Sequence, residues 1–252
     1  MAYLMEIDKY LQERLQLNNF NEDYSNNGLQ VEGKKEIKKI GFGVDASEEL
    51  FKDAASMGAD MIFVHHGISW GKGIKYFSGR FGNLLKILFQ NDISLYAAHL
   101  PLDAHPILGH NALIADMIGL QQRYSFGTYC GTNIGYAGKI DSLQVSTLGE
   151  ELAKKLNSTF KIYGKNRIVS KIGIISGGSG SDGIEEAAAS GLECLVTGEV
   201  GHSSWHLIKE LGINVISCGH YKTEVPGVKA IQNDLLQQFD IQTVFIDIPT
   251  GL

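Results

Sequence analysis

Short apolar runs alternate with segments of helical spacing along most of the chain. After an amphipathic helix expected over 1–17, the pattern predicts strands at 37–44, 60–64 and 93–98 and helices at 48–57, 80–90 and 111–118. Ser47 is the expected N-cap of the helix at 48–57, and Gly58 ends it. Such alternation is typical of βαβ units, so it predicts an α/β fold with a mostly parallel sheet.

The second half of the chain repeats this plan. Strands are expected at 171–176, 193–197 and 213–218, helices at 184–190 and 203–211, and a glycine-rich loop at 177–183. Segments 39–67 and 171–198 share the order strand, turn, helix, glycine, acidic residue, strand and loop. This order favours two related α/β halves, although similar secondary structure alone would produce much of the likeness. Glycines among aromatic residues and threonines predict short β elements and loops over 121–170, without indicating a function.

Composition limits the class of protein. The 252 residues are 44% hydrophobic and 20% charged, which is the mix of a folded globular chain that is large enough for one domain or two small ones. The formal net charge of −6 argues against a general nucleic-acid surface, which needs clustered Lys and Arg. No run approaches the roughly 20 apolar residues of a membrane span, and the first residues lack the pattern of a signal peptide.

The cysteines indicate a reducing compartment. Cys130, Cys194 and Cys218 are an odd number, are widely spaced and form no Cys-x-x-Cys pair. Cys194 and Cys218 lie in apolar, strand-like runs, where we expect buried thiols. A cytoplasmic location fits this usage.

The candidate chemistry lies where predicted strands end. His65 and His66 follow one strand, His99 ends a second and His220 follows a third, while Asp103 and Glu224 each come four residues after one of these histidines. In open α/β sheets, ligands bind at the carboxyl edge because its loops converge on one crevice. Imidazole and carboxylate ligands suit Zn, Fe, Mn or Ni.

Five of these residues are enough for a dinuclear metal site, with water completing the coordination: His65, His66, Asp103, His220 and Glu224. Thr223 and Pro226 fit the cap and the first turn of a helix, which would hold Glu224 near a helix N-terminus. The alternative for any single histidine is a hydrogen-bonded structural role, which we favour for His105 and His110. For the whole set that alternative is weak, because burying so many unpaired polar groups is costly.

Several motifs carry a family resemblance. They are Asn27-Gly-Leu-Gln-Val-Glu-Gly33, Val64-His-His-Gly67, His99-Leu-Pro-Leu-Asp103-Ala-His-Pro106, Gly219-His-Tyr-Lys-Thr-Glu224 and Phe245-Ile-Asp-Ile-Pro249. Together they resemble the Nif-three-like dinuclear-metal family, whose members are often labelled GTP cyclohydrolase I type 2 homologs, and in particular its bacterial YbgI-like branch.

The resemblance implies two interlocked α/β domains, with the metal-binding domain expected over 1–124 plus 219–252 and a related domain over 125–218. It also implies a toroidal homohexamer whose dinuclear sites face the interior. The ligands that it implies are His65, His66, Asp103, His220 and Glu224, with Glu224 bridging the two ions and His99 as an outer ligand, an orienting residue or a proton shuttle.

Three other motifs point elsewhere. A dinucleotide fingerprint is matched by Gly178-Ser-Gly-Ser-Asp-Gly183, with Glu199 as the ribose-binding acid, and would indicate an oxidoreductase. The chain, however, leaves little room for two nucleotide-binding halves. A helix N-terminus there could still bind a substrate phosphate. His202 and His206 would share one helix face, without the glutamate of a zinc peptidase. Trp70 would either pack or serve as a stacking platform.

The leading hypothesis is therefore a dinuclear metal-dependent hydrolase, with two divalent ions per subunit (Zn, Fe or Mn). The family label suggests hydrolysis of a small nucleotide such as GTP. The alternative is a ring-shaped metal-handling or binding protein without turnover. The partners expected are copies of the same chain and a small-molecule substrate. No membrane is expected, and nucleic acid is disfavoured rather than excluded.

Overall fold

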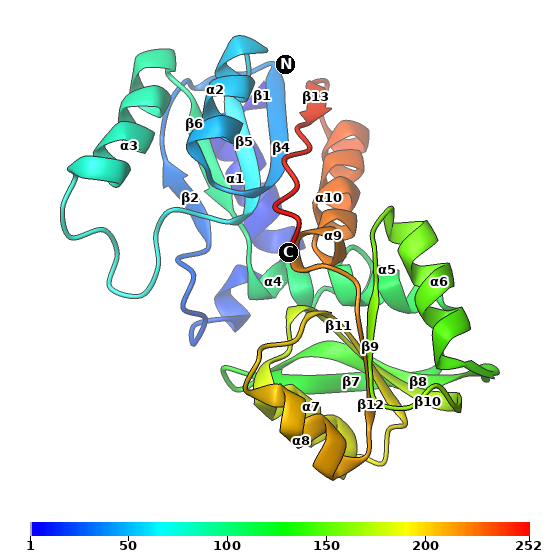
Figure 1. Cartoon of the computed structure of the whole chain (residues 1–252). Coiled ribbons are helices and arrows are strands. Elements are labelled where there is room, and N and C mark those ends of the chain that lie inside the picture. Colours follow the sequence, from blue (N-terminus) through cyan, green and yellow to red (C-terminus); the bar gives the residue numbers. More distant parts are fainter. Residues whose placement is uncertain (1) are drawn as a thin grey trace. The chain divides into compact units, whose positions relative to one another are not determined.

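The computed structural model describes residues 2–252 (Figure 1). The chain forms two compact units, and each is built from more than one stretch of sequence. Unit 1 comprises the residues up to Leu102 together with Gly227–Ile248, and unit 2 comprises Asp103–Pro226 together with Pro249–Leu252. The domain boundaries given above for the sequence stay a prediction.

Unit 1 contains the parallel sheet expected from the sequence. Its strand order is β13-β4-β5-β6-β2. Strands β4 (Lys39–Asp45), β5 (Met61–His66), β6 (Ser94–Ala97) and β13 (Gln242–Phe245) run parallel, while β2 (Gly28–Val31) pairs antiparallel with β6 at the edge. Parallel strands are buried on both faces, which explains their nearly continuous apolar sequences.

Helices cover this sheet. Helices α2 (Glu48–Ser56) and α3 (Gly79–Asn91) pack through Leu50, Phe51, Leu84 and Leu88 against Ile62, Val64 and Leu95 of the strands. Ser47 caps α2 as predicted, since its side chain accepts a hydrogen bond from the Leu50 N–H at 3.1 Å. Alternation along the strands turns Phe42, Phe63 and Tyr96 to the opposite face, where neighbouring ring centroids lie 5.6 and 5.9 Å apart. Helix α1 (Leu4–Arg14) is joined to α10 (Val225–Gln238) by the ion pair of Arg14 with Asp234 at 2.9 Å.

Two predictions in unit 1 need correction. The helix expected over 1–17 is shorter, because β1 (Ala2–Tyr3) pairs with β3 (Glu36–Ile37) before α1 begins. The sequence also predicts a loop at 101–106 after the strand at 93–98, but Leu100–Asp103 form the short helix α4, in which the chain passes from unit 1 to unit 2.

The sheet of unit 2 is mixed rather than mostly parallel. Its order is β7-β8-β10-β11-β12-β9. Strands β10 (Ile168–Gly178), β11 (Cys194–Glu199) and β12 (Asn214–Ser217) are parallel, whereas β7 (Gln121–Tyr129), β8 (Thr132–Gln144) and β9 (Lys161–Tyr163) join antiparallel. The helices are α5 (His110–Met117), α6 (Val145–Leu156), α7 (Gly180–Ala189), α8 (Ser204–Leu211) and α9 (His220–Thr223).

Unit 2 also departs from several sequence expectations. Region 121–170 holds a long hairpin and helix α6, whose Leu148, Leu152 and Leu156 are buried at helical spacing, a signal present in the sequence. Helix α7 begins at Gly180, inside the segment expected as a loop. His202 precedes α8, so the prediction that His202 and His206 share one helix face is wrong. The thiols of Cys194 and Cys218 are buried as expected, and burial raises the pKa of Cys218 to about 12.

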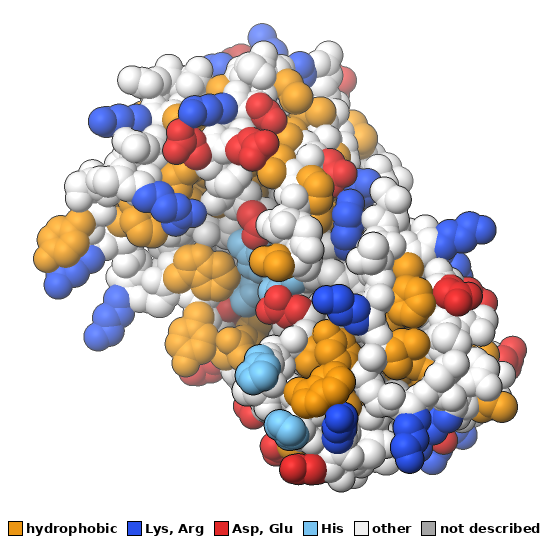
Figure 2. All heavy atoms as spheres, in the orientation of Figure 1, with side chains coloured by type: hydrophobic (Ala, Val, Ile, Leu, Met, Phe, Trp, Pro, Cys, Tyr) orange, Lys and Arg blue, Asp and Glu red, His pale blue; other side chains and the backbone are white. Residues whose placement is uncertain are grey.

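The surface charge and the helix lengths are the features relevant to nucleic-acid and membrane partners. On the face shown in Figure 2, Lys and Arg side chains are scattered among acidic ones. Within residues 2–252, no helix has both the length and the apolar character that a bilayer crossing needs.

Candidate functional site

Three histidines of unit 1 gather at the carboxyl edge of its sheet. His65 and His66 end β5, and His99 follows the neighbouring strand β6. Their candidate ligand nitrogens all lie within 4.8 Å of one another. The ring centroid of His65 lies 4.5 Å from that of His66 and 5.1 Å from that of His99. The sequence prediction that strand ends bring these side chains together therefore holds within unit 1.

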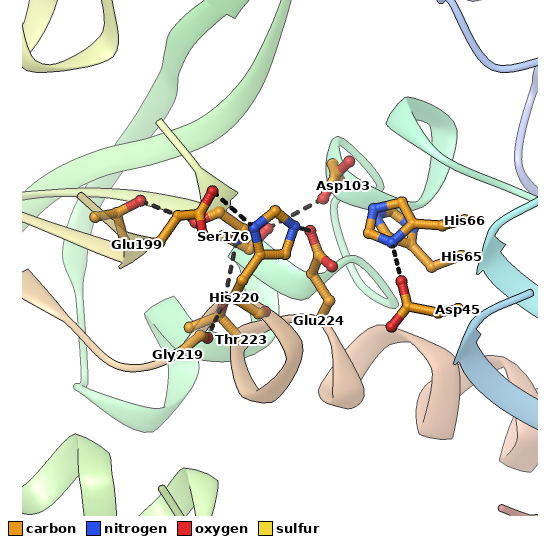
Figure 3. A network of polar contacts seen from close by, with 12 residues as sticks. Asp45, His65, His66, Asp103, Ser176, Glu199, Gly219, His220, Thr223 and Glu224 are labelled. Carbon is orange, nitrogen blue, oxygen red and sulfur yellow. Dashed lines mark hydrogen bonds and ion pairs between the residues drawn. The ribbon is translucent and has the colours of Figure 1, made fainter. Parts of the chain in front are cut away.

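An oxygen atom holds the Nδ1 of each ring. His65 Nδ1 lies 2.9 Å from the carbonyl oxygen of Ala98, His66 Nδ1 lies 2.8 Å from Asp45 Oδ1 (Figure 3), and His99 Nδ1 lies 2.9 Å from Asp23 Oδ1. Carbonyl and carboxylate oxygens only accept hydrogen bonds, so Nδ1 is the donor in each pair, and a neutral ring then keeps its lone pair on Nε2. Metal-ligating histidines have this arrangement, in which an outer oxygen fixes the tautomer and the ring orientation.

The partner of His66 follows from the strand register. Asp45 is the last residue of β4 and is paired directly with His66 of β5. The sequence predictions place Asp45 between the strand at 37–44 and the helix at 48–57 and give it no role at the site. Its position at the end of a predicted strand, at the same sheet edge as the histidines, was the signal that could have found it.

His99 is held by a buried clamp. The Asp23 side chain has no exposed surface, and its Oδ2 accepts hydrogen bonds from the Leu100 N–H at 3.0 Å and from Asn27 Nδ2 at 2.8 Å. Asn27 Oδ1 in turn accepts from the His99 N–H at 2.7 Å. Burial alone would raise the pKa of Asp23, but the hydrogen bonds from His99, Asn27 and the Ser25 backbone outweigh it and lower the pKa. Asp23 lies 76 residues before His99, and no local pattern marks it.

In unit 2, Asp103 belongs to a polar network. Its carboxylate is buried and accepts a hydrogen bond from Ser176 Oγ at 3.0 Å (Figure 3). Asn111 Nδ2 donates to the carbonyl oxygens of Asp103 at 3.3 Å and of Ile134 at 2.8 Å, and its Oδ1 accepts from the Ser176 N–H at 2.7 Å. The network fixes the Asp103 side chain beside the end of β10.

His220 lies between two carboxylates. Its Nε2 is 3.2 Å from Glu224 Oε1, and its Nδ1 is 3.3 Å from Glu199 Oε1 (Figure 3). Burial lowers the pKa of His220, but Glu224 and Glu199 together outweigh burial and raise it to about 9. The Glu224 side chain is only 5% exposed. Glu199, the ribose-binding acid of the oxidoreductase hypothesis, lies beside His220 in this structure.

Two glycines allow α9 to approach the strands. At Gly177, where φ is +60°, a Cβ would collide with Glu224 Oε1 and lie 3.1 Å from His220 Nε2. A Cβ at Gly198 would lie 2.6 Å from Thr223 Oγ1 and 2.7 Å from the Cα of His220. Thr223, expected to cap the following helix, instead accepts a hydrogen bond from the Gly177 N–H at 2.9 Å. Because these two glycines have no side chain, His220 and Glu224 can lie this close to the strands.

For His105 and His110 the sequence predicts structural roles. His105 Nδ1 accepts hydrogen bonds from the backbone of Ile107 and Leu108 at 3.2 and 3.0 Å, which is the structural role expected of it. His110 is buried at the start of α5. Unit 1 thus carries His65, His66 and His99, and unit 2 carries Asp103, His220 and Glu224. Imidazole nitrogens held at Nδ1 and buried carboxylates are a donor set that could bind divalent metal ions.

Comparison with known proteins agrees with the motifs. The family model for Duf34/NIF3 (NGG1p interacting factor 3) matches residues 2–251. Proteins named GTP cyclohydrolase 1 type 2 homolog from Archaeoglobus fulgidus and Pyrococcus horikoshii are each 43% identical over 250 residues, covering 99% and 98% of both chains, respectively. A solved structure described as protein ybgI, of unknown function, matches with a TM-score of 0.91 at 33% identity and covers 100% of both chains.

Proposed function

Since the chain belongs to the Duf34/NIF3 family, we propose that it is a hydrolase that depends on two divalent metal ions and acts on a nucleotide. The observation that carries this proposal is the set of histidines whose Nδ1 atoms are held by oxygen, because that arrangement prepares Nε2 to bind a metal. Relatives named GTP cyclohydrolase 1 type 2 homolog support a purine nucleotide such as GTP as the substrate.

In this proposal five residues hold the ions: His65, His66, Asp103, His220 and Glu224. When bound, the ions supply Lewis acidity and stabilise the negative charge that develops during hydrolysis. The residues suit Zn, Fe and Mn. The family resemblance implies that Glu224 would be the carboxylate shared by the two ions. A ring of six chains, which the family resemblance implied, is part of the same proposal.

The chain's own residues would do the rest of the chemistry. Ala98, Asp45, Asp23 and Glu199 orient the four histidines through their Nδ1 atoms. His99, held by Asp23 on one side, is placed to hold or transfer a proton at Nε2. Asp23 would stabilise the charged ring while the proton is held.

Elemental mass spectrometry on untagged protein tests the metal site. We expect about two ions per chain in the wild type, a marked loss in Glu224→Ala and no loss in Glu210→Ala, which removes an exposed glutamate of α8. The metal-loaded protein is then incubated with GTP, phosphoesters and cyclic amides. Product formation that Glu224→Ala abolishes supports the hydrolase.

Two other results would change the proposal. Absence of stoichiometric metal after reconstitution would overturn the metal site itself. Two ions per chain without turnover of any substrate would overturn the hydrolase and favour a metal-handling protein without catalysis.

A further inference from the structure

Trp70 lies on a short loop that is fixed at several points. The loop follows the histidines of β5, and the indole Nε1–H donates a hydrogen bond to the Gly67 carbonyl at 2.8 Å. The Trp70 backbone bridges to Ser25, and the Gly71 N–H donates to the Tyr24 carbonyl at 2.6 Å. Gln30 Oε1 accepts hydrogen bonds from Ile68 N at 2.8 Å and Ser69 N at 3.2 Å. These bonds hold the indole in one orientation.

The indole contacts the histidine cluster of unit 1. Its centroid lies 5.1 Å from that of His99, at an interplanar angle of 72°, and 6.1 Å from that of His66 at 39°. The Trp70 ring therefore forms part of the surroundings of two histidines whose Nδ1 atoms are anchored away by carboxylates.

Trp70 is left partly exposed at this position. It is 37% exposed, whereas Ile68, two residues earlier, is 5% exposed and already anchors the loop in the core. A large aromatic side chain that is held rigidly and left partly in water gives up part of its hydrophobic stabilisation. A rigid, partly exposed indole is suited to stacking on a planar ligand, because the side chain loses little further entropy on binding.

We propose that the Trp70 indole is the stacking wall for the planar nitrogen heterocycle of the substrate, a purine base, and so determines specificity for an aromatic ring beside His66 and His99. This inference rests on the proposed function and adds the residue that recognises the base. Stacking accepts any base with a π-face, so Trp70 selects a ring while other contacts choose among rings.

The fluorescence of Trp70 tests this directly. The chain has two tryptophans, Trp70 and Trp205, so Trp205→Phe leaves Trp70 as the single emitting tryptophan. We expect GTP and guanosine to quench this emission in the metal-loaded protein and inorganic triphosphate to leave it unchanged. Trp70→Leu should weaken GTP binding, measured by calorimetry, roughly five- to a hundredfold, with metal content unchanged. Trp70→Phe should retain most of the affinity.

Phe77→Ala is the matched control, because Phe77 is an exposed aromatic residue of the same unit. It lines a groove of about 760 Å³ with Ile68, Leu85 and Phe89, where a planar ligand could bind instead. Loss of GTP affinity in Phe77→Ala with none in Trp70→Leu would overturn the proposal, as would equal quenching by triphosphate. Two ions per chain with no binding of any purine would overturn the stacking role while leaving the metal site intact.

Discussion

At the scale of single residues, the anchors of the histidines differ in how firmly they are held. Asp45 and Glu199 have side chains that are 40% and 52% exposed, so water competes for their hydrogen bonds to His66 and His220. The Asp23 side chain has no exposed surface and has hydrogen-bond partners on both oxygens. A change at Asp23 therefore has the largest expected effect among the carboxylate anchors.

Asp23→Asn tests this anchor. The new amide can adopt two orientations. In one, its nitrogen faces the donors Leu100 N–H and Asn27 Nδ2. In the other, its nitrogen faces His99, so the hydrogen bond to that ring is lost and the imidazole turns or changes tautomer. We expect turnover by the metal-loaded protein to fall about 10- to 100-fold, because His99 is the proton-transfer residue of the proposal, with metal content unchanged in elemental mass spectrometry. Glu22→Gln, an exposed neighbour, should turn over substrate as the wild type does. Unchanged turnover in Asp23→Asn would show that the clamp does not act on His99 during catalysis.

The close approach at Gly198 gives a second prediction for one residue. In Gly198→Ala the new methyl group would lie 2.5 Å from the Gly177 carbonyl oxygen and 2.7 Å from the Cα of His220, so α9 must move. We expect a loss of about 1–3 kcal/mol in the free energy of unfolding and a loss of metal. Gly201→Ala is the control, since its methyl group meets Ser203 Oγ at an ordinary 3.7 Å. A Gly198→Ala protein with wild-type stability and metal content would contradict the packing described for α9.

At the scale of elements, Asp60 and Glu193 occupy equivalent places in the two units. Each precedes a parallel strand, β5 or β11, and its carboxylate accepts two backbone hydrogen bonds from consecutive residues just before or within the neighbouring strand, β4 or β10. Their backbone bonds match as well, since Asp60 N–H donates to Lys39 O and Glu193 N–H to Lys171 O at 2.8 and 2.9 Å. The likeness of segments 39–67 and 171–198 thus extends from sequence order to hydrogen bonding, which favours two related halves.

These carboxylates predict a pH-dependent stability. Burial raises the pKa of Asp60, but Lys34 and the Lys38 and Lys39 backbone lower it below its ordinary 3.8. The Ser170 and Lys171 backbone lowers that of Glu193 below 4.5. Stabilisation by the ionised form is therefore present above the unfolded pKa and disappears as the pH falls through the folded pKa.

In urea unfolding near pH 7, Asp60→Asn and Glu193→Gln should each lose about 1–3 kcal/mol, with Glu150→Gln, an exposed residue of α6, unchanged. The difference from wild type should shrink below about pH 4. A difference that persists undiminished at pH 2.5 would contradict an ionic cause.

Several elements were predictable from the sequence, and the exceptions have physical reasons. The buried strands β4, β5, β6, β11 and β12 have apolar runs that packing on both faces requires, so the pattern located them to within a few residues. Helix α6 was missed among the glycines of its region, although Leu148, Leu152 and Leu156 mark its buried face. Helix α4 has only four residues, too few for a periodic pattern.

For the whole molecule, the sequence indicated the candidate histidines more completely than the residues that orient the site. Strand ends indicated His65, His66, His99 and His220, because parallel strands all have their carboxyl ends at the same edge of a sheet. Asp23 and Ser176 reach their partners from loops or strands 76 and 73 residues away along the chain, a separation that only tertiary folding can bring together. Asp45 could have been found from its place at the end of β4, as the partner of His66 in the strand register.

The proposed metal ligands come from distant parts of the whole chain, and a double-mutant cycle measures whether they act together. His66 ends β5, and His220 begins α9. At metal concentrations a hundredfold above Kd, the wild type should gain about 2.7 kcal/mol of stability, which is a rise of roughly 5–10 °C in Tm for a chain of this size. His66→Ala and His220→Ala should each remove much of this gain, and His202→Ala, an exposed histidine ahead of α8, none. If both residues bind within one centre, the double variant loses little more than either single variant, because the first change already dismantles the site. Two independent sites would instead make the two losses add, and that outcome would contradict the proposed dinuclear centre.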